Sequence, residues 1–300
     1  MAYLIRQMGH VIISSPDPIG AAQDLAEIVG LRIAEEEKGE VYLTSNDRHH
    51  EVTYVKGDGK AVALGLEAVS AEAIDEVYQR ARSDGLTILD DRPAGKCYDR
   101  AVRILAPGGA IFEIHTPIHR NQPRQYNYGS AVRPRRIEHV NVFAQDTQAL
   151  GEFCEKTLGM KLSDKTADEG LRWYRAQDGF HHTIAMGPGA SGLHHYAFDL
   201  HALEDLAGIA DNLARKDRAL VWGPGRHGAG GNIFTYYADP HGCLVENSIE
   251  LDRIDNDATY EPRTWDISEG LAGRWLNLWG TPPTESFLRP GIPFDTRRAE

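Results

Sequence analysis

The chain has 300 residues, of which 41% are hydrophobic and 25% charged, a composition typical of a globular protein that buries a full core. Its net charge of −12 argues against a nucleic-acid partner, since phosphate binding favours a basic surface. No apolar run approaches the length of a membrane span, the first residues do not form a signal peptide, and three cysteines without CxxC spacing suit a reducing compartment. We therefore expect a cytoplasmic protein that binds neither membrane nor nucleic acid.

The two halves of the chain repeat one pattern of elements. GHVIISSPDPIGAAQDLAEIVGLRI near residue 10 matches EHVNVFAQDTQALGEFCEKTLGMKL near residue 139, and each predicts a strand opening on His, a turn with Asp, a helix and a new strand. RHHEVTYV then matches FHHTIAMG, AEAIDEVYQRARSDGLTI matches LEDLAGIADNLARKDRAL as a second helix, and LAPGGAIFEIH matches YADPHGCLVENS. Glu113 and Glu246 therefore occupy matching places.

Each half therefore contains two β-α-β-β-β units, whose curved sheet can close around a cavity. The predicted fold is α+β, with two barrel-like domains made of tandem repeats. The predicted parts are a non-catalytic domain (1–120), a linker rich in Asn, Pro, Arg and Gln (121–134), a metal-binding domain (135–252) and a tail that covers it (253–300).

Strand alternation brings three possible metal ligands to one face. His139, His195 and Glu246 all point to the concave side if the apolar residues of their strands pack under helices. Two imidazoles and one carboxylate form the facial triad of non-haem Fe(II) oxygenases. The plainer interpretation, core histidines and a surface glutamate, does not account for three matching strand positions in a repeat.

The first half offers an internal comparison. It keeps His10 and Glu113 at the places of His139 and Glu246, but Gly65 is predicted at the place of His195. We therefore expect no catalytic metal in the first half, and structural roles for His10 and Glu113.

These residues resemble the two-domain type I extradiol dioxygenases of the vicinal-oxygen-chelate superfamily, which include catechol, homoprotocatechuate and dihydroxybiphenyl 2,3-dioxygenases. The resemblance covers nearly the whole chain and is most specific from Arg135 to Glu250. It places the family's metal ligands on His139, His195 and Glu246. It implies extradiol cleavage of an aromatic diol with O₂ as co-substrate at a mononuclear Fe(II), giving a muconic semialdehyde-type product. Mn(II) fits the same triad. Members of the family are commonly oligomers, so the resemblance also implies a homo-oligomer.

Further matches imply roles around the metal. The GPGRHG loop places a histidine beside the ligands at His227, and FTYYADPHG places the active-site tyrosine at Tyr236. The family's acid–base histidine falls on His181, fourteen residues before the second metal histidine, and strand alternation favours it over its neighbour His182. The catalytic candidates are His181, Tyr236 and His227, and the substrate-binding candidates are Trp173, Asn141, Trp222 and His182.

One departure from the family pattern concerns the substrate. The homoprotocatechuate branch carries an arginine just before GPGRHG that binds an acidic side chain, and this chain has Trp222 there. That change favours a more apolar catechol. Each candidate also has a plainer interpretation, as a core or loop histidine, a barrel-lining aromatic side chain, or a strand-edge asparagine.

Three other functions stay open. A metal-dependent lyase or isomerase resembling glyoxalase I usually draws ligands from both repeats, and it leaves His181 and Tyr236 unexplained. A metal-free module resembling the bleomycin-sequestering proteins needs no His, His, Glu set. A purely structural role is the weakest, because polar residues lining a barrel cost stability unless they are used.

Overall fold

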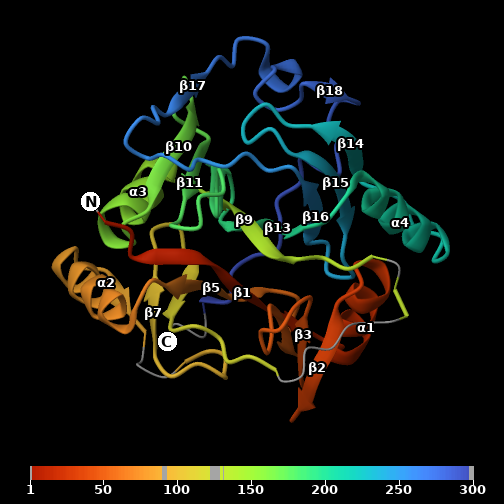
Figure 1. Cartoon of the computed structure of the whole chain (residues 1–300), viewed down its shortest axis with the longest axis horizontal. Helices are drawn as coiled ribbons and strands as arrows, with labels where there is room; N and C mark the ends of the chain where they lie inside the picture. The colour runs from red at the N-terminus through yellow and green to blue at the C-terminus, as the bar shows by residue number, and fades with distance from the viewer. Residues whose placement is uncertain (1, 90–92, 122–128, 131, 297–300) are drawn as a thin grey trace.

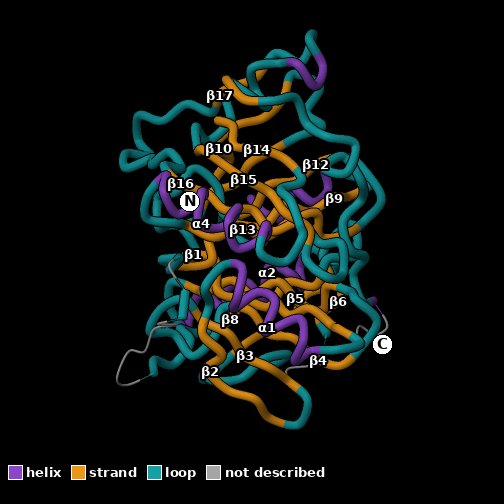
Figure 2. Tube along the Cα trace, turned by 90° about the vertical axis from the view of Figure 1, so that its right-hand side faces the viewer, coloured by secondary structure: helices purple, strands orange, loops and turns teal. Residues whose placement is uncertain are grey.

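The computed structural model describes residues 2–89, 93–121, 129–130 and 132–296. Its strands form a sheet of eight from the first half and a sheet of ten from the second half and the tail. Figure 1 shows the first half below the second with helices towards the outer sides, and the turned view in Figure 2 shows the same order. Each half contains two successive β-α-β-β-β units, so the predicted α+β fold of tandem repeats is confirmed.

The first half follows the predicted order of elements. Asp17 caps its first helix, because the carboxylate accepts a hydrogen bond from Gly20 N at 3.0 Å. Ser70 caps the second helix through Ala73 N at 3.3 Å. The elements are β1 (Ile5–Ser15), α1 (Pro18–Ile28), β2 (Arg32–Glu37), β3 (Glu40–Thr44), β4 (Val52–Lys56), β5 (Ala61–Ala68), α2 (Ala71–Ser83), β6 (Thr87–Ile88), β7 (Ala101–Leu105) and β8 (Ile111–His115).

The second half repeats this plan. Asp146 takes the place of Asp17 and caps the first helix of this half through Ala149 N at 2.9 Å. That helix is short and continues into a π-helical turn at Phe153–Thr157. The elements are β9 (Arg136–Ala144), α3 (Thr147–Glu152), β10 (Lys161–Thr166), β11 (Arg172–Arg175), β12 (Ile184–Pro188), β13 (Gly192–Asp199), α4 (Leu203–Ala214), β14 (Trp222–Arg226), β15 (Ile233–Ala238) and β16 (Leu244–Ile249).

The segment after β16 lies across the second half and is drawn in blue in Figure 1. Its strands β17 (Arg263–Trp265) and β18 (Trp279–Gly280) pair with β10 and β14 and extend the sheet at both edges. Farther on, Phe294 forms a bridge with Ala61, so the chain returns to the first half.

The predicted domain boundaries stay predictions. Most of the predicted linker, 121–134, lies outside the described residues. Among the helices of the described chain, none is long and apolar enough to cross a membrane.

The first strand of each half contains a β-bulge at a matching position. In the first half β1 runs antiparallel to β5, and in the second half β9 runs antiparallel to β13. From Met8 to Val11 the chain advances three residues while β5 advances two, and from Ile137 to Val140 it does the same against β13. Such a bulge sets two residues opposite one and re-aims their side chains.

This register corrects one prediction. Gly65 lies opposite Glu113 in the first sheet, and Ala197 lies opposite Glu246 in the second. Gly65 therefore corresponds to Ala197 and not, as predicted, to His195, which lies two residues earlier on its strand.

The place of His195 in the first half is held by Ala63, which offers no ligand atom. Gly65 has a different role, since a Cβ there would lie 2.4 Å from the ring of His10. Aligning the two halves by sequence alone did not identify Ala63 as the equivalent of His195, because the bulges that set the register are not visible in the sequence.

Candidate active site

Three side chains from three neighbouring strands meet in the second half. His139 comes from β9, His195 from β13 and Glu246 from β16, and all three are buried. Nε2 of His139 lies 3.1 Å from Oε2 of Glu246, and Nε2 of His195 lies 3.2 Å from the same oxygen. In the described part of the chain, no other three His, Cys, Asp or Glu side chains bring their ligand atoms within 4.8 Å of one another. The structure thus brings together the three predicted metal ligands.

This donor set fits a divalent iron or manganese ion. Ligand atoms on adjacent corners of an octahedron with bonds of about 2.1 Å are about 3 Å apart, which agrees with both distances to Glu246 Oε2. Two nitrogens and one carboxylate oxygen on one face leave the opposite positions for other ligands.

The charges of the three groups are coupled. Although burial raises it, the pKa of Glu246 is held well below its usual range by His139 and His195. Despite burial, which favours the neutral ring, Glu246 and Glu138 raise the pKa of His139 to about 9. A metal ion and a proton compete for the same imidazole nitrogen, so metal binding here should release a proton.

The bulge in β9 explains how His139 is oriented. Adjacent residues of a regular strand point to opposite faces, yet Oε2 of Glu138 lies 3.0 Å from Nδ1 of His139. The bulge at this dipeptide lets both side chains turn to the same side. Glu138 thereby fixes the ring of His139, with Nε2 directed at Glu246.

A chain of two histidines orients His195. Nδ1 of His194 lies 2.8 Å from Nδ1 of His195, and Nε2 of His194 lies 2.7 Å from the carbonyl oxygen of Phe287. Burial lowers the pKa of His194 to about 3, so its ring is neutral at neutral pH. A carbonyl only accepts, so His194 carries its proton on Nε2 and accepts at Nδ1 from His195. The lone pair of His195 is therefore on Nε2, the atom nearest Glu246.

Tyr236 and His227 lie beside the triad, as predicted from the GPGRHG and FTYYADPHG motifs. The hydroxyl of Tyr236 donates to Oε2 of Glu246 at 2.7 Å and lies 3.0 Å from Nε2 of His227. Nδ1 of His227 donates to the carbonyl of Leu276 at 2.6 Å. Burial raises the pKa of Tyr236 well above its usual range and lowers that of His227 to about 4, so both are neutral at neutral pH.

The structure distinguishes the positions of His181 and His182. His182 lines the active-site cavity and packs on His139 with ring centroids 4.3 Å apart, whereas His181 does not line it. Nε2 of His181 instead lies at ion-pair distance, 3.2 Å, from Oδ2 of Asp164. The strand alternation used in the prediction does not apply, because the pair precedes β12, which begins at Ile184.

The two histidines are nevertheless linked, since their Nδ1 atoms lie 3.1 Å apart. Asp164 favours the proton of His181 on Nε2, so Nδ1 of His181 accepts from Nδ1 of His182. This leaves the Nε2 atom of His182 as an acceptor. Burial lowers the pKa of His182 well below its usual range, which keeps this nitrogen unprotonated at neutral pH.

The triad lies in the wall of a cavity of about 360 Å³. The predicted substrate-binding residues Trp173 and Asn141 line it, and Oδ1 of Asn141 is buried without a hydrogen-bond partner in the protein. In the described structure, none of the lining residues is a lysine or an arginine. The tail supplies part of the wall through Leu271, Trp275, Leu276, Phe287, Leu288 and Pro290.

Trp222, a predicted substrate-binding residue, does not line the cavity. It is buried behind Tyr236, with the two rings stacked at 5.7 Å, and its Nε1 donates to the carbonyl of Thr281 at 2.8 Å. Phe287, which lines the cavity, packs on the rings of Trp222 and Tyr236 at 4.4 and 4.9 Å.

Several residues of the site were not predicted. Asn232 donates to Oε1 of Glu246 at 2.8 Å from the glycine-rich turn after His227. His194 and Glu138 orient the ligands, and their position directly before a metal histidine is the signal that could have identified them. The apolar tail residues have no partner in the repeat, so no comparison between the halves could find them.

The first half holds a related but different cluster. Nε2 of His10 lies 3.3 Å from Oε1 of Glu113, which also accepts a hydrogen bond from Tyr98. His115 packs on His10 at 4.9 Å. No third ligand atom in the described residues of this half joins them within 4.8 Å.

Comparison with known proteins agrees with this architecture. The family model described as Glyoxalase/Bleomycin resistance protein/Dioxygenase superfamily matches residues 7–114 and 136–247. The chain belongs to this superfamily. Among curated relatives, Metapyrocatechase 2 of Cupriavidus necator is 25% identical over 306 residues, which cover 96% of this chain and 92% of the relative.

Two solved structures show the same fold along almost the whole chain. The Mn(II)-bound glyoxalase from Novosphingobium aromaticivorans has a TM-score of 0.86 and 24% identity, with 97% of both chains covered. The homoprotocatechuate 2,3-dioxygenase from Arthrobacter globiformis has a TM-score of 0.87 and 21% identity, with 98% of this chain and 93% of the other covered.

Proposed function

We propose that this protein is an extradiol dioxygenase that opens the ring of a catechol bearing an apolar substituent. The observation that carries the proposal is the His139, His195 and Glu246 triad in the wall of a largely apolar cavity, with neutral acid–base groups beside it. The names of the relatives, metapyrocatechase and homoprotocatechuate 2,3-dioxygenase, support it.

The three ligands would hold Fe(II) or Mn(II). When bound, such an ion would position the catechol and O₂ and stabilise negative charge that develops on oxygen. Fe(II) is our first choice because the two-histidine, one-carboxylate set is typical of iron oxygenases, and the Mn(II)-bound structure of a similar fold makes manganese the alternative to test.

Tyr236 and His227 would control the protons at the substrate oxygens. Tyr236 is a neutral phenol and a hydrogen-bond donor whose acceptor Glu246 is itself a ligand. Nε2 of His227 accepts, because its Nδ1 donates to Leu276 O. A donor and an acceptor 3.0 Å apart can together hold or take up the proton of a catechol hydroxyl.

We assign the acid–base role predicted for His181 to His182. Its unprotonated Nε2 belongs to a ring that lines the cavity next to His139. Asp164 and His181 fix the tautomer of His182 through its Nδ1 atom, which lies away from the reacting nitrogen Nε2. Proton transfer by a group positioned in this way contributes typically about 10²–10⁴-fold to rate.

The shape of the cavity supports an apolar substituent. An apolar cavity of about 150 Å³ is enough for one benzene ring, and this cavity of about 360 Å³ has room beyond the catechol ring itself. Among the described lining residues, none carries a positive charge that would pair with a substrate carboxylate. Trp173, Trp275 and Phe287 offer aromatic surface for the substituent.

The test is anaerobic loading with Fe(II) or with Mn(II), followed by a 4-alkylcatechol and air. A yellow product that forms with uptake of one O₂ per catechol would support the proposal, and the two metal loadings compared would identify the active ion. Metal bound without O₂ uptake, across several substituted catechols, would favour the lyase or isomerase class, for which the glyoxalase neighbour is the structural precedent.

A further inference from the structure

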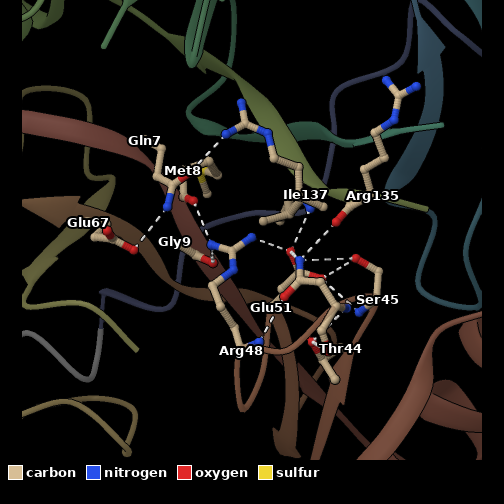
Figure 3. Close-up of polar contacts among 12 residues, drawn as sticks. Gln7, Met8, Gly9, Thr44, Ser45, Arg48, Glu51, Glu67, Arg135 and Ile137 are labelled. Carbon is tan, nitrogen blue, oxygen red and sulfur yellow. Dashed lines mark hydrogen bonds and ion pairs between the residues drawn. The ribbon is translucent and has the colours of Figure 1, made fainter. Parts of the chain in front are cut away.

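A buried ion pair of the first half reaches the strand that carries a metal ligand of the second. Arg48 and Glu51 lie between β3 and β4, with 7% and 0% of their surfaces exposed, and an Nη2 hydrogen of Arg48 is donated to Oε1 of Glu51. Figure 3 shows the pair where the two halves meet.

Each member of the pair contacts one of the two corresponding bulges. Nη1 of Arg48 donates to the carbonyls of Met8 and Gly9, at 3.0 and 3.2 Å, in the bulge of β1. Oε1 of Glu51 accepts from the backbone N–H of Ile137 at 2.9 Å, directly before the bulge of β9. The pair therefore connects two matching places at which the sheets depart from regular pairing.

The bulge in β9 is the feature that aims a metal ligand. Ile137 immediately precedes Glu138 and His139, whose side chains turn to the same side there. A bulge weakens the ladder around it, so backbone groups nearby need partners outside the sheet. Glu51 is such a partner for Ile137 N. The position of the Glu51 carboxylate therefore influences the position of the backbone at His139.

Glu51 is itself held rigidly, which a positioning group requires. Its Oε2 accepts from Ser45 N at 2.8 Å, and its Oε1 accepts from Asn46 Nδ2 at 2.8 Å. The same amide nitrogen of Asn46 donates to the carbonyl of Arg135 at 3.0 Å. Two backbone groups of the β9 entry, Ile137 N and Arg135 O, are thus tied to the first half, as Figure 3 shows.

Stability alone does not account for this arrangement. A buried ion pair is often no more stabilising than apolar residues of the same size, although removing one partner is costly. We propose that Glu51 is a positioning residue for the metal site, fixing the β9 bulge so that Nε2 of His139 points at Glu246. This inference rests on the metal site of the proposed function.

The first test is a Mn(II) titration. Binding is measured from the electron paramagnetic resonance signal of the Mn(II) that stays free. Glu51→Asp keeps the charge beside Arg48 but shortens the reach to Ile137 N, and Glu51→Gln removes the charge. Changing groups that orient a metal ligand typically weakens affinity by about 10- to 100-fold, and we expect at least the lower value for both variants.

The matched control is Glu113→Gln, which alters another buried glutamate of the first half whose contacts stay in that half. It should lower the thermal midpoint of the metal-stripped protein, as the Glu51 variants do, while binding Mn(II) as the wild type does. If the Glu51 variants lose stability but keep wild-type Mn(II) affinity, the pair is only structural and the inference is wrong. If the wild type binds no Mn(II), the proposed metal site fails instead.

A second test needs no variant. Coupling of binding free energies is reciprocal, so Mn(II) should slow hydrogen exchange both in the peptide around residues 136–140 and in the loop 45–51. Protection of 136–140 without any change in 45–51 would overturn the inference, even if the Glu51 variants proved too unstable to titrate.

Discussion

The histidine chain behind His195 allows a sharp test of the ligand geometry. In His194→Phe the ring keeps a similar size, but the acceptor for His195 Nδ1 and the donor to the Phe287 carbonyl are both lost. Without an acceptor at Nδ1, the His195 proton can move to Nε2, the atom that would bind the metal. The variant should therefore bind metal more weakly.

The size of this effect follows from the contact that is lost. A buried donor left without its acceptor costs about 1–3 kcal/mol. Loss of a group that orients a metal-ligating histidine typically weakens binding by about 10- to 100-fold, which is about 1.4–2.8 kcal/mol. The two figures agree, so the Mn(II) dissociation constant of His194→Phe should rise by about 10- to 100-fold.

The assay is Mn(II) titration of the folded variant at pH 7.5, with the thermal midpoint measured on metal-stripped protein. His115→Phe is the matched control, because His115 is also buried and one of its ring nitrogens, Nδ1, contacts a backbone carbonyl, that of Thr116 at 2.7 Å, as Nε2 of His194 contacts that of Phe287. The control should lose stability with unchanged Mn(II) affinity. Wild-type affinity in His194→Phe would refute the tautomer argument for His195.

Three further predictions concern catalysis, selectivity and pH. Tyr236→Phe removes the donor to Glu246, and O₂ uptake at saturating metal should fall about 10²-fold with little change in thermal midpoint; near-wild-type uptake would contradict the role of the phenol. KM for 3,4-dihydroxyphenylacetate should exceed that for 4-ethylcatechol by more than about tenfold, because burying the substrate carboxylate without a positive partner is costly. Equal KM values would mean that a positively charged group reaches the carboxylate. Burial raises the pKa of Asp239 to about 7. Between about pH 4 and 7 the unfolded chain has therefore released a proton that the folded chain keeps. The free energy of unfolding should then fall by up to about 1.4 kcal/mol for each unit that the pH rises in this range. Asp239→Asn, whose side-chain oxygen can still accept from His241 N and Cys243 N, should flatten that slope in urea unfolding, and an unchanged slope would assign it to another group.

The repeat in the sequence was enough to predict the order of elements, because each half supplies the same helix caps and strand patterns. Asp17 and Asp146 begin equivalent helices. The triad was also predictable, since His139, His195 and Glu246 occupy strand positions that the repeat marks, although the bulge that aims His139 is not visible in the sequence. These features depend on local pattern, which a sequence carries directly.

The errors arose where local pattern is broken. Alternation selected His181, but the histidine pair lies in an irregular segment before β12 and the structure places His182 in the cavity. Counting along the sequence matched Gly65 to His195, but the register shows that Ala63 is the residue equivalent to His195. Nothing in the sequence shows that Phe287 of the tail packs on Trp222 or that Trp222 lies outside the cavity lining.

The register also predicts that restoring one ligand will not turn the first half into a metal site. Ala63 belongs to a small apolar cluster with Ile12, which corresponds to Asn141, and Ile111, so apolar side chains fill the region where the second half has its cavity. Gly9 takes the place of Glu138, and a Cβ there would lie 2.1 Å from His115 Nε2.

An Ala63→His variant would therefore bury an imidazole among apolar neighbours, with no counterpart of Glu138 to orient His10. We expect it to lower the free energy of unfolding by about 2 kcal/mol, through overpacking and an unpaired polar group, and to leave one Mn(II) bound per chain. A second tightly bound Mn(II) would show that a missing imidazole alone separates the two halves. One Mn(II) in a folded but less stable variant would show that restoring the imidazole is not enough to make a metal site in the first half.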